Sequence, residues 1–148
     1  MATLLGIARK AKKRDSVELL DEAEVSLDRG IDGDWRGRPG NRQVTLMTLA
    51  SWQAACAEVG ADLPWIVRRA NLLVDDLDLR NSTGRKIRVG EACLEVVEET
   101  KPCHRMDEQH TGLTEALRPE WRGGVCCRVI KAGNISIGDV AEVALVAN

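Results

Sequence analysis

The apolar residues of this chain fall into short β-rich segments separated by glycine-rich turns, and this pattern restricts the fold more than any other feature. Seven or eight such segments follow one another, each long enough for about one strand of 5 to 6 residues. They cover residues 16–27, 44–49, 71–75, 85–89, 92–97, 121–130, 134–138 and 140–146. Many short strands with frequent turns are typical of a β-barrel or a β-sandwich, so the sequence predicts a mostly β protein.

Two segments between the strands carry helical signals instead. Thr48 or Ser51 is placed to cap the first helix, and Gly60 is placed to end it. The second helix is short and is predicted over residues 112–117, with Thr111 as its cap. The apolar residues of the first helix recur at helical spacing: Leu49, Trp52, Ala55, Cys56 and Val59.

The composition limits both the core and the function classes. The 148 residues include four Trp but neither Phe nor Tyr, so Leu, Val, Ile and Ala must fill the core. Proteins that bind single-stranded nucleic acid need aromatic stacking platforms and a basic groove, and this chain has few aromatics and a net charge of −2. We therefore expect no nucleic-acid partner. The chain has neither internal repeats nor a linker, which predicts one domain over residues 1–148.

The distribution of apolar residues also bears on localisation. No apolar run approaches the roughly 20 residues that a membrane helix needs, so no membrane partner is expected. The segment 1–14 turns strongly basic and does not resemble a secretory signal. We expect a cytoplasmic protein with reduced cysteines, whose spacing fits neither a disulfide framework nor a paired zinc motif.

The five cysteines have different expected environments. Cys56 falls on the apolar stripe of the first helix, and Cys93 lies in a strand beside an apolar neighbour, so both are expected to pack. Cys126 and Cys127 are adjacent in a strand and must point to opposite faces of it. At most one of those two thiols can face a given site.

Cys103 is the strongest candidate for a functional residue. It lies in a polar loop predicted over residues 98–110, where Lys101, His104 and Arg105 supply positive charge. Such surroundings favour the thiolate, which is the form that attacks, carries sulfur or binds soft metals. The alternative is an exposed, inert thiol on a non-catalytic barrel that binds a small molecule or a partner.

Arg68 and Arg69 precede a predicted strand, where an arginine fork could grip a phosphate or a carboxylate. The alternative is that they are two surface cations beside the end of a strand.

Two other observations complete the candidate list. Cys103 would form a three-ligand zinc set with His104 and His110, but both histidines share one loop and a second ligand pair is missing. Zinc is therefore not favoured. Trp35 lies beside Asp34 in the long glycine-rich loop and is the one aromatic residue that we expect near a ligand.

Five motifs occur in an order that resembles the MOSC domain, which is named after the C-terminal domain of molybdenum cofactor sulfurases. The motifs are Gly30-Ile31-Asp32-Gly33-Asp34, Arg42-Gln43-Val44-Thr45-Leu46, Arg69-Ala70-Asn71-Leu72-Leu73-Val74, Val89-Gly90-Glu91-Ala92 followed by Pro102-Cys103, and the closing Gly123-Gly124-Val125 and Gly133-Asn134-Ile135. The resemblance implies a closed or partly closed β-barrel, like the barrel insert of pyruvate kinase, with two or three short helices.

The resemblance also implies a cofactor and a site. It marks Cys103 as the family's cysteine, which carries sulfur or ligates molybdenum in a molybdopterin cofactor. Arg69 and Asn71 would contact this molybdenum cofactor, with Arg42 close by. The remaining cofactor-binding candidates lie in the basic segment, the glycine-rich loop and the cysteine loop: Lys13, Arg14, Asp34 and Thr100.

These features lead to one functional hypothesis with two forms. The chain would bind molybdenum cofactor and act through Cys103 in sulfur transfer or in the reduction of N-hydroxylated compounds. Its partners would be molybdopterin or a small N-hydroxylated substrate, with a cysteine desulfurase or an electron-donor protein. The chain lacks a pyridoxal-phosphate-dependent desulfurase domain, so this second cofactor is not expected.

Overall fold

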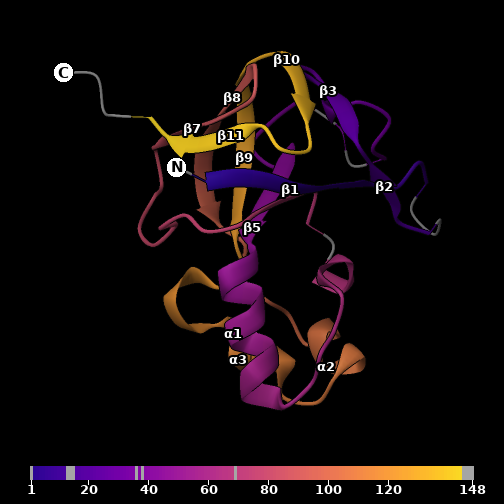
Figure 1. The fold of residues 1–148 in the computed structure, drawn as a ribbon, viewed down its shortest axis with the longest axis vertical. Helices are drawn as coiled ribbons and strands as arrows, with labels where there is room; N and C mark the ends of the chain where they lie inside the picture. The colour runs from indigo at the N-terminus through magenta and orange to yellow at the C-terminus, as the bar shows by residue number, and fades with distance from the viewer. Residues whose placement is uncertain (1, 13–15, 36, 38, 69, 145–148) are drawn as a thin grey trace.

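The computed structural model describes residues 2–12, 16–35, 37, 39–68 and 70–144, and its main element is a closed barrel (Figure 1). Seven of the described strands pair in a ring, in the order β1, β11, β7, β8, β9, β5, β6 and back to β1. Only β5 and β6 pair in parallel. The strands are β1 (Ala2–Arg9), β5 (Val44–Thr48), β6 (Leu72–Val74), β7 (Lys86–Val89), β8 (Ala92–Glu99), β9 (Val125–Lys131) and β11 (Val140–Val143).

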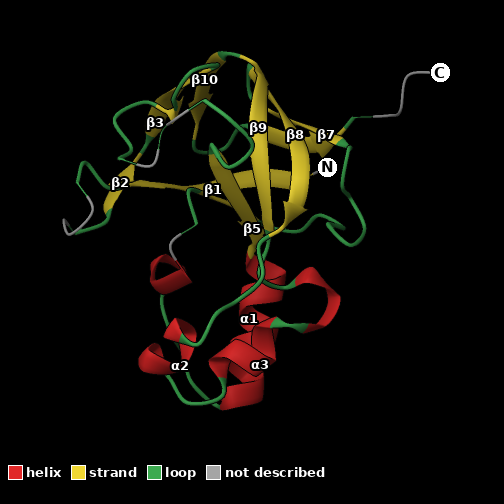
Figure 2. Cartoon of the chain, turned by 180° about the vertical axis from the view of Figure 1, so that it is seen from behind, coloured by secondary structure: helices red, strands yellow, loops and turns green. Residues whose placement is uncertain are grey.

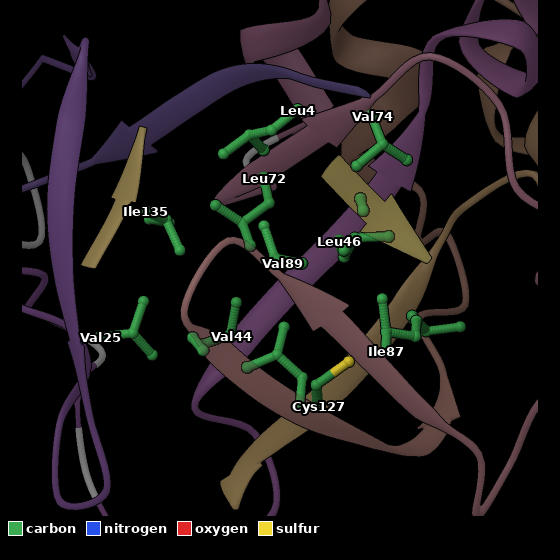
Figure 3. Packing of buried hydrophobic residues seen from close by; sticks show 14 of the residues in the cluster. Leu4, Val25, Val44, Leu46, Leu72, Val74, Ile87, Val89, Cys127 and Ile135 are labelled. Atoms are coloured by element: carbon green, nitrogen blue, oxygen red, sulfur yellow. The ribbon is translucent and has the colours of Figure 1, made fainter. Parts of the chain in front are cut away.

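Four further strands extend the barrel at one end. β2 (Glu18–Leu20) adds to β1, and a separate sheet has the order β10 (Gly133–Ser136), β3 (Glu22–Ser26) and β4 (Gly30–Ile31). The small sheet closes over the barrel interior with Val25, Ile31 and Ile135, which join the same buried cluster as the barrel residues. Figure 3 shows Val25 and Ile135 opposite the barrel residues.

Three short α-helices lie together beneath the barrel in Figures 1 and 2. They are α1 (Leu49–Val59), α2 (Arg105–Gln109) and α3 (Leu113–Leu117), and two 3-10 turns accompany them, η1 (Trp65–Arg68) and η2 (Pro119–Trp121). Thr48 begins α1 by accepting the Ser51 N–H at 3.1 Å on its Oγ1, and Gly60 ends it with φ of 70°. In the described part of the chain, no helix has the length and apolar character that crossing a membrane requires.

Alternating side chains on β5 divide the apolar residues between two cores. Leu46 points into the barrel, where the buried cluster consists of aliphatic side chains and Cys127. Met47 points outward and packs with α1 and α3, where Trp52 and Leu113 are buried. The barrel interior therefore serves packing alone, and functional side chains have to lie on the outer surface.

The predicted mostly β fold with a closed barrel and short helices is confirmed. Strand β1 was not predicted, because its inward alternation breaks at a register shift between Leu4 and Gly6. The count of seven or eight strands was too low as well. The region 16–27 holds two strands in place of one, and β4 is only two residues long.

Two expectations around the cysteine loop were wrong. Helix α2 occupies part of the segment 98–110 that was expected to be a loop, and of its residues only Met106 is buried. A five-residue helix with one buried side chain has no periodicity to detect. Thr111 does not cap α3, since Gly112 takes that position with φ of 89° and no side-chain cap bond forms.

Candidate functional site

Cys103 opens onto a cavity of about 160 Å³ between the barrel and the helices. It is exposed and lies in the short link from β8 to α2. The cavity wall combines residues from β5, η1, the β8–α2 link, α2 and the turn before β9. These residues are Thr45, Arg68, Ala70, Thr100, Cys103, Arg105, Met106, Glu108, Gln109 and Gly123.

The backbone at Cys103 is held by the two short helices that follow it. The Cys103 carbonyl accepts the Met106 N–H at 3.0 Å and the Thr114 hydroxyl at 2.8 Å. Asp107 accepts the Thr114 N–H at 2.9 Å, which joins α2 to α3. This backbone hydrogen bond is the largest of the causes that hold the pKa of Asp107 below its ordinary value.

Arg68 ties the opposite wall of the cavity together. One Nη of its guanidinium donates to the Thr100 carbonyl at 2.9 Å and to the Gly123 carbonyl at 3.1 Å. Any side chain at position 123 would collide with the Thr100 carbonyl, so the close approach of the two segments requires glycine. The charge of Arg68 is therefore fixed beside the link that carries Cys103.

A second thiol lies behind this wall. Cys126 is buried, and its Sγ lies 3.1 Å from the Thr100 hydroxyl. A side-chain hydrogen bond to Cys126 is the main cause that raises the pKa of Arg42, with a smaller contribution from Glu98, whose Oε1 lies 3.2 Å from the Arg42 Nε. Cys127, next to Cys126 in the chain, faces the barrel core, and burial raises the pKa of its thiol.

Asn71 joins three segments at the edge of the barrel. Its Nδ2 donates to the Ala8 carbonyl at 3.1 Å and to the Asp34 carboxylate at 3.3 Å. Its Oδ1 accepts the Thr45 N–H at 3.0 Å and the Thr45 hydroxyl at 3.2 Å. Two donor hydrogens and two acceptor positions are thereby engaged, which is the full capacity of a primary amide.

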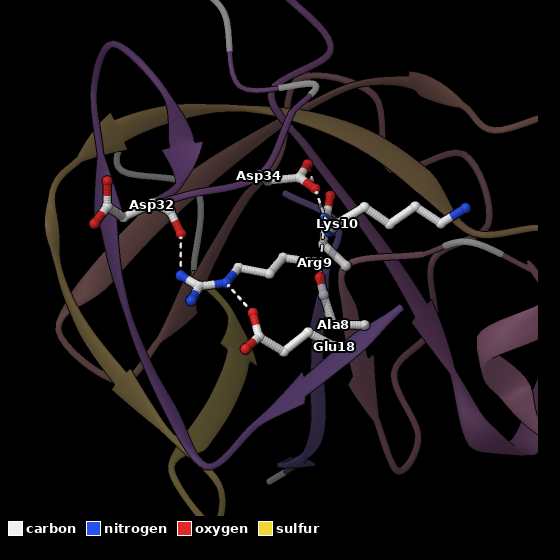
Figure 4. Close-up of polar contacts among 7 residues, drawn as sticks. Ala8, Arg9, Lys10, Glu18, Asp32 and Asp34 are labelled. Carbon is white, nitrogen blue, oxygen red and sulfur yellow. Dashed lines mark hydrogen bonds and ion pairs between the residues drawn. The ribbon is translucent and has the colours of Figure 1, made fainter. Parts of the chain in front are cut away.

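A small hollow lies beyond Asn71, on the side of the glycine-rich loop. Figure 4 shows the polar contacts of Arg9 and Asp34 in this region. Asp34 accepts the Lys10 N–H at 3.0 Å, and the Lys10 carbonyl accepts the Trp35 N–H at 2.7 Å. Arg9 donates to Glu18 and to the Asp32 carbonyl, each at 2.7 Å. Ala70 lines both this hollow and the Cys103 cavity, so the two lie on either side of one short segment.

The structure brings the predicted site residues together in two groups. Cys103 and Thr100 line the cavity, whereas Arg42 does not line it and interacts with Cys126, the thiol beside Thr100. Asp34 and Asn71 line the hollow, together with Trp35. Lys13, Arg14 and Arg69 lie outside the described residues.

Cys126 and Thr45 had no assigned place in the predicted site, and Arg68 was predicted only as one of two arginines that could grip an anion. The hydrogen bonds of Arg68 and the contact between Cys126 and Thr100 join segments that lie far apart in the sequence. Strand alternation had indicated only that Cys126 and Cys127 point to opposite faces. Thr45 carried no signal beyond its strand. In the described part of the chain, no group of three His, Cys, Asp or Glu side chains is placed to hold a metal ion. Cys103, His104 and His110 therefore do not form such a group.

Comparison with known proteins agrees with this fold. The family described as the MOSC domain matches residues 29–142. The crystal structure of the YuaD protein from Bacillus subtilis is similar, with a TM-score of 0.77 and 19% identity over 97% of this chain and 96% of that one. The crystal structure of YiiM from Escherichia coli is also similar, with a TM-score of 0.69 and 17% identity over 98% of this chain and 71% of that one. No curated protein matches this chain.

Replacing Asn71 by Ala removes four side-chain hydrogen bonds and leaves the buried Thr45 N–H without its acceptor. We expect Asn71→Ala to lower the free energy of unfolding by about 1 to 3 kcal/mol, the usual cost of unsatisfied buried groups. Urea unfolding measures this. Asn134→Ala, at an exposed position in β10, serves as the matched control and should change stability by less than about 0.5 kcal/mol. Equal midpoints for the two variants would contradict the role given to Asn71.

Asp107 should contribute to stability in a pH-dependent way. Its pKa is lower in the folded protein than in the unfolded chain, so its contribution is present above the unfolded value of about 3.9 and disappears as the pH falls through the folded value. Asp107→Asn retains an acceptor for Thr114 but does not titrate. We expect the difference in unfolding free energy between the wild type and this variant to shrink between about pH 6 and about pH 3. A difference that does not change with pH contradicts this origin.

Proposed function

This chain belongs to the MOSC domain family, and on that premise we propose that it is a sulfur-handling protein associated with the molybdenum cofactor, in which Cys103 carries the sulfur. One observation carries the proposal. Of the five cysteines, all within the described ranges, Cys103 alone is exposed, and it opens onto a cavity whose wall includes Arg68 and Arg105. A carrier thiol must reach both a donor and an acceptor, and an exposed position allows this.

The transfer step requires only a donor persulfide. The Cys103 thiolate attacks the outer sulfur of the donor, a new sulfur–sulfur bond forms at Cys103, and the donor's own sulfur–sulfur bond breaks. The donor leaves as a thiolate with the electron pair, and Cys103 becomes the persulfide. A cysteine desulfurase is the class of partner that supplies such a persulfide.

The donor set around the cavity also fits the family's cofactor. The Cys103 thiolate is a soft ligand suited to a metal already held by sulfur, and Arg68 and Arg105 suit the anionic parts of a molybdopterin. When bound, molybdenum supplies two-electron chemistry of the kind that reduces N-hydroxylated compounds. That reduction is the second candidate function, and the exposed thiol with two arginines on the cavity wall is the observation that favours it.

Sulfur transfer predicts a covalent change at one residue. After incubation with a cysteine desulfurase and free cysteine, we expect the protein to gain the mass of one sulfur atom, located at Cys103 by peptide mass spectrometry. A reducing agent should remove it, because a persulfide is reducible. Cys103→Ser should gain no sulfur, whereas Cys93→Ser, at a buried strand position, should gain it as the wild type does. Equal sulfur uptake by Cys103→Ser refutes the carrier function.

Cofactor binding predicts metal in the purified protein. From a host that makes molybdenum cofactor, we expect the wild type to copurify with molybdenum, measured by elemental analysis per mole of protein. Cys103→Ser should lose most of it because the metal loses its protein thiolate, and Cys93→Ser should retain it. If the wild type contains no molybdenum and takes up no added cofactor, the cofactor part of the proposal fails, while the sulfur test stands separately.

A further inference from the structure

Two guanidinium groups from distant parts of the chain meet at the Cys103 cavity. Arg68 comes from η1, before β6, and Arg105 begins α2, two residues after the thiol. Glu108 is the one acidic side chain among the described residues that line this cavity. The charged groups on the wall therefore leave a net positive charge beside an exposed thiol.

The position of Arg68 is fixed independently of any ligand. Its hydrogen bonds to the Thr100 and Gly123 carbonyls hold the guanidinium between the cysteine link and the turn before β9. A charge held in place in this way does not need to be ordered when an anion arrives, which lowers the cost of binding. Arg105 lies on the exposed side of the cavity and completes the pair.

We propose that this cavity selects anionic sulfane-sulfur donors, thiosulfate being the simplest, and that Arg68 and Arg105 bind the oxyanion end while Cys103 attacks the sulfane sulfur. The inference rests on the proposed function, since it names the class of small donor for the same thiol. Guanidinium groups pair with sulfur oxyanions through charge-assisted hydrogen bonds, as they do with carboxylate and phosphate.

The step balances without another reactant. The Cys103 thiolate forms a bond to the outer sulfur of thiosulfate, the sulfur–sulfur bond of thiosulfate breaks, and sulfite leaves with the electron pair. The products are the Cys103 persulfide anion and sulfite, and the total charge of minus three is the same on both sides. Because negative charge builds up on the departing sulfite, fixed cations beside it stabilise the transition state.

The volume of the cavity agrees with a donor of this size. About 160 Å³ accommodates a small oxyanion next to the thiol, whereas a donor carried on a protein loop has to approach Cys103 from the exposed side. The two kinds of donor would thus share the thiol but differ in their need for the arginines. That difference can be measured.

The test compares an anionic donor with a neutral one. Purified protein is mixed with thiosulfate, and sulfite release and the sulfur gain at Cys103 are followed over time. With an uncharged dialkyl trisulfide, the Cys103 thiolate attacks an outer sulfur, forms a mixed disulfide and displaces an alkyl persulfide anion, so the formation of that mixed disulfide is followed instead. We expect Arg105→Gln to slow the thiosulfate reaction by about tenfold and the trisulfide reaction by less than about twofold. Arg105→Lys should recover part of the rate, because it restores the charge without the planar guanidinium.

Controls separate charge at the cavity from charge elsewhere. Arg118→Gln removes an exposed arginine that pairs with Glu115 on α3, at 2.9 Å, and should leave both rates unchanged. Circular dichroism and urea midpoints verify that Arg105→Gln is folded, as expected for an exposed side chain. Cys103→Ser should release no sulfite.

The outcomes distinguish this inference from the proposed function. If thiosulfate releases no sulfite while a cysteine desulfurase still loads Cys103, the anion selectivity is wrong and the carrier function remains. Equal slowing of both donors by Arg105→Gln also overturns the selectivity. If neither thiosulfate nor the desulfurase loads Cys103, both the inference and the proposed function fail.

Discussion

The amide of Asn71 is the contact on which the rest of the site depends. Its four hydrogen bonds join the end of β1, strand β5 and the glycine-rich loop at one point on the barrel edge. Because Ala70 next to it lines both the hollow and the cavity, Asn71 anchors the short segment that lies between the two. An aspartate at position 71 would place a second carboxylate beside Asp34 and would lose both donors.

The barrel separates packing from chemistry by the alternation of its strands. On β9, Cys127 faces the aliphatic interior, while Cys126 faces outward to Thr100 and Arg42. A shift of one residue in the pairing of β9 would exchange these two thiols, placing a polar contact in the core. The extensive pairing of β9 with both β5 and β8 therefore also preserves the wall of the site.

The sequence contained the information for the fold and the central thiol but not for the network around them. Strand alternation, the capping Thr48 and Gly60 predicted most elements, and positive charge near Cys103 drew attention to it. Family resemblance gave Asn71 a place at the site, yet its partners lie 26 to 63 residues away in the chain. Contacts of this kind have no local pattern, since closure of the barrel creates them. The same holds for Arg68, whose hydrogen-bond partners Thr100 and Gly123 lie 32 and 55 residues away in the chain.

Because one of the five cysteines is exposed, a thiol-reactive label would attach to the native protein at a single position. Cys56 and Cys127 are buried in the two cores, Cys126 lies behind Thr100, and Cys93 is buried on β8. Cys103 is the one exposed cysteine. A maleimide dye or a nitroxide added to the unaltered chain would attach at the cavity mouth, so spectroscopy can follow that surface without first removing other cysteines. As the chain unfolds, a colorimetric assay would count five reactive thiols in place of one, so the number of reactive thiols measures unfolding.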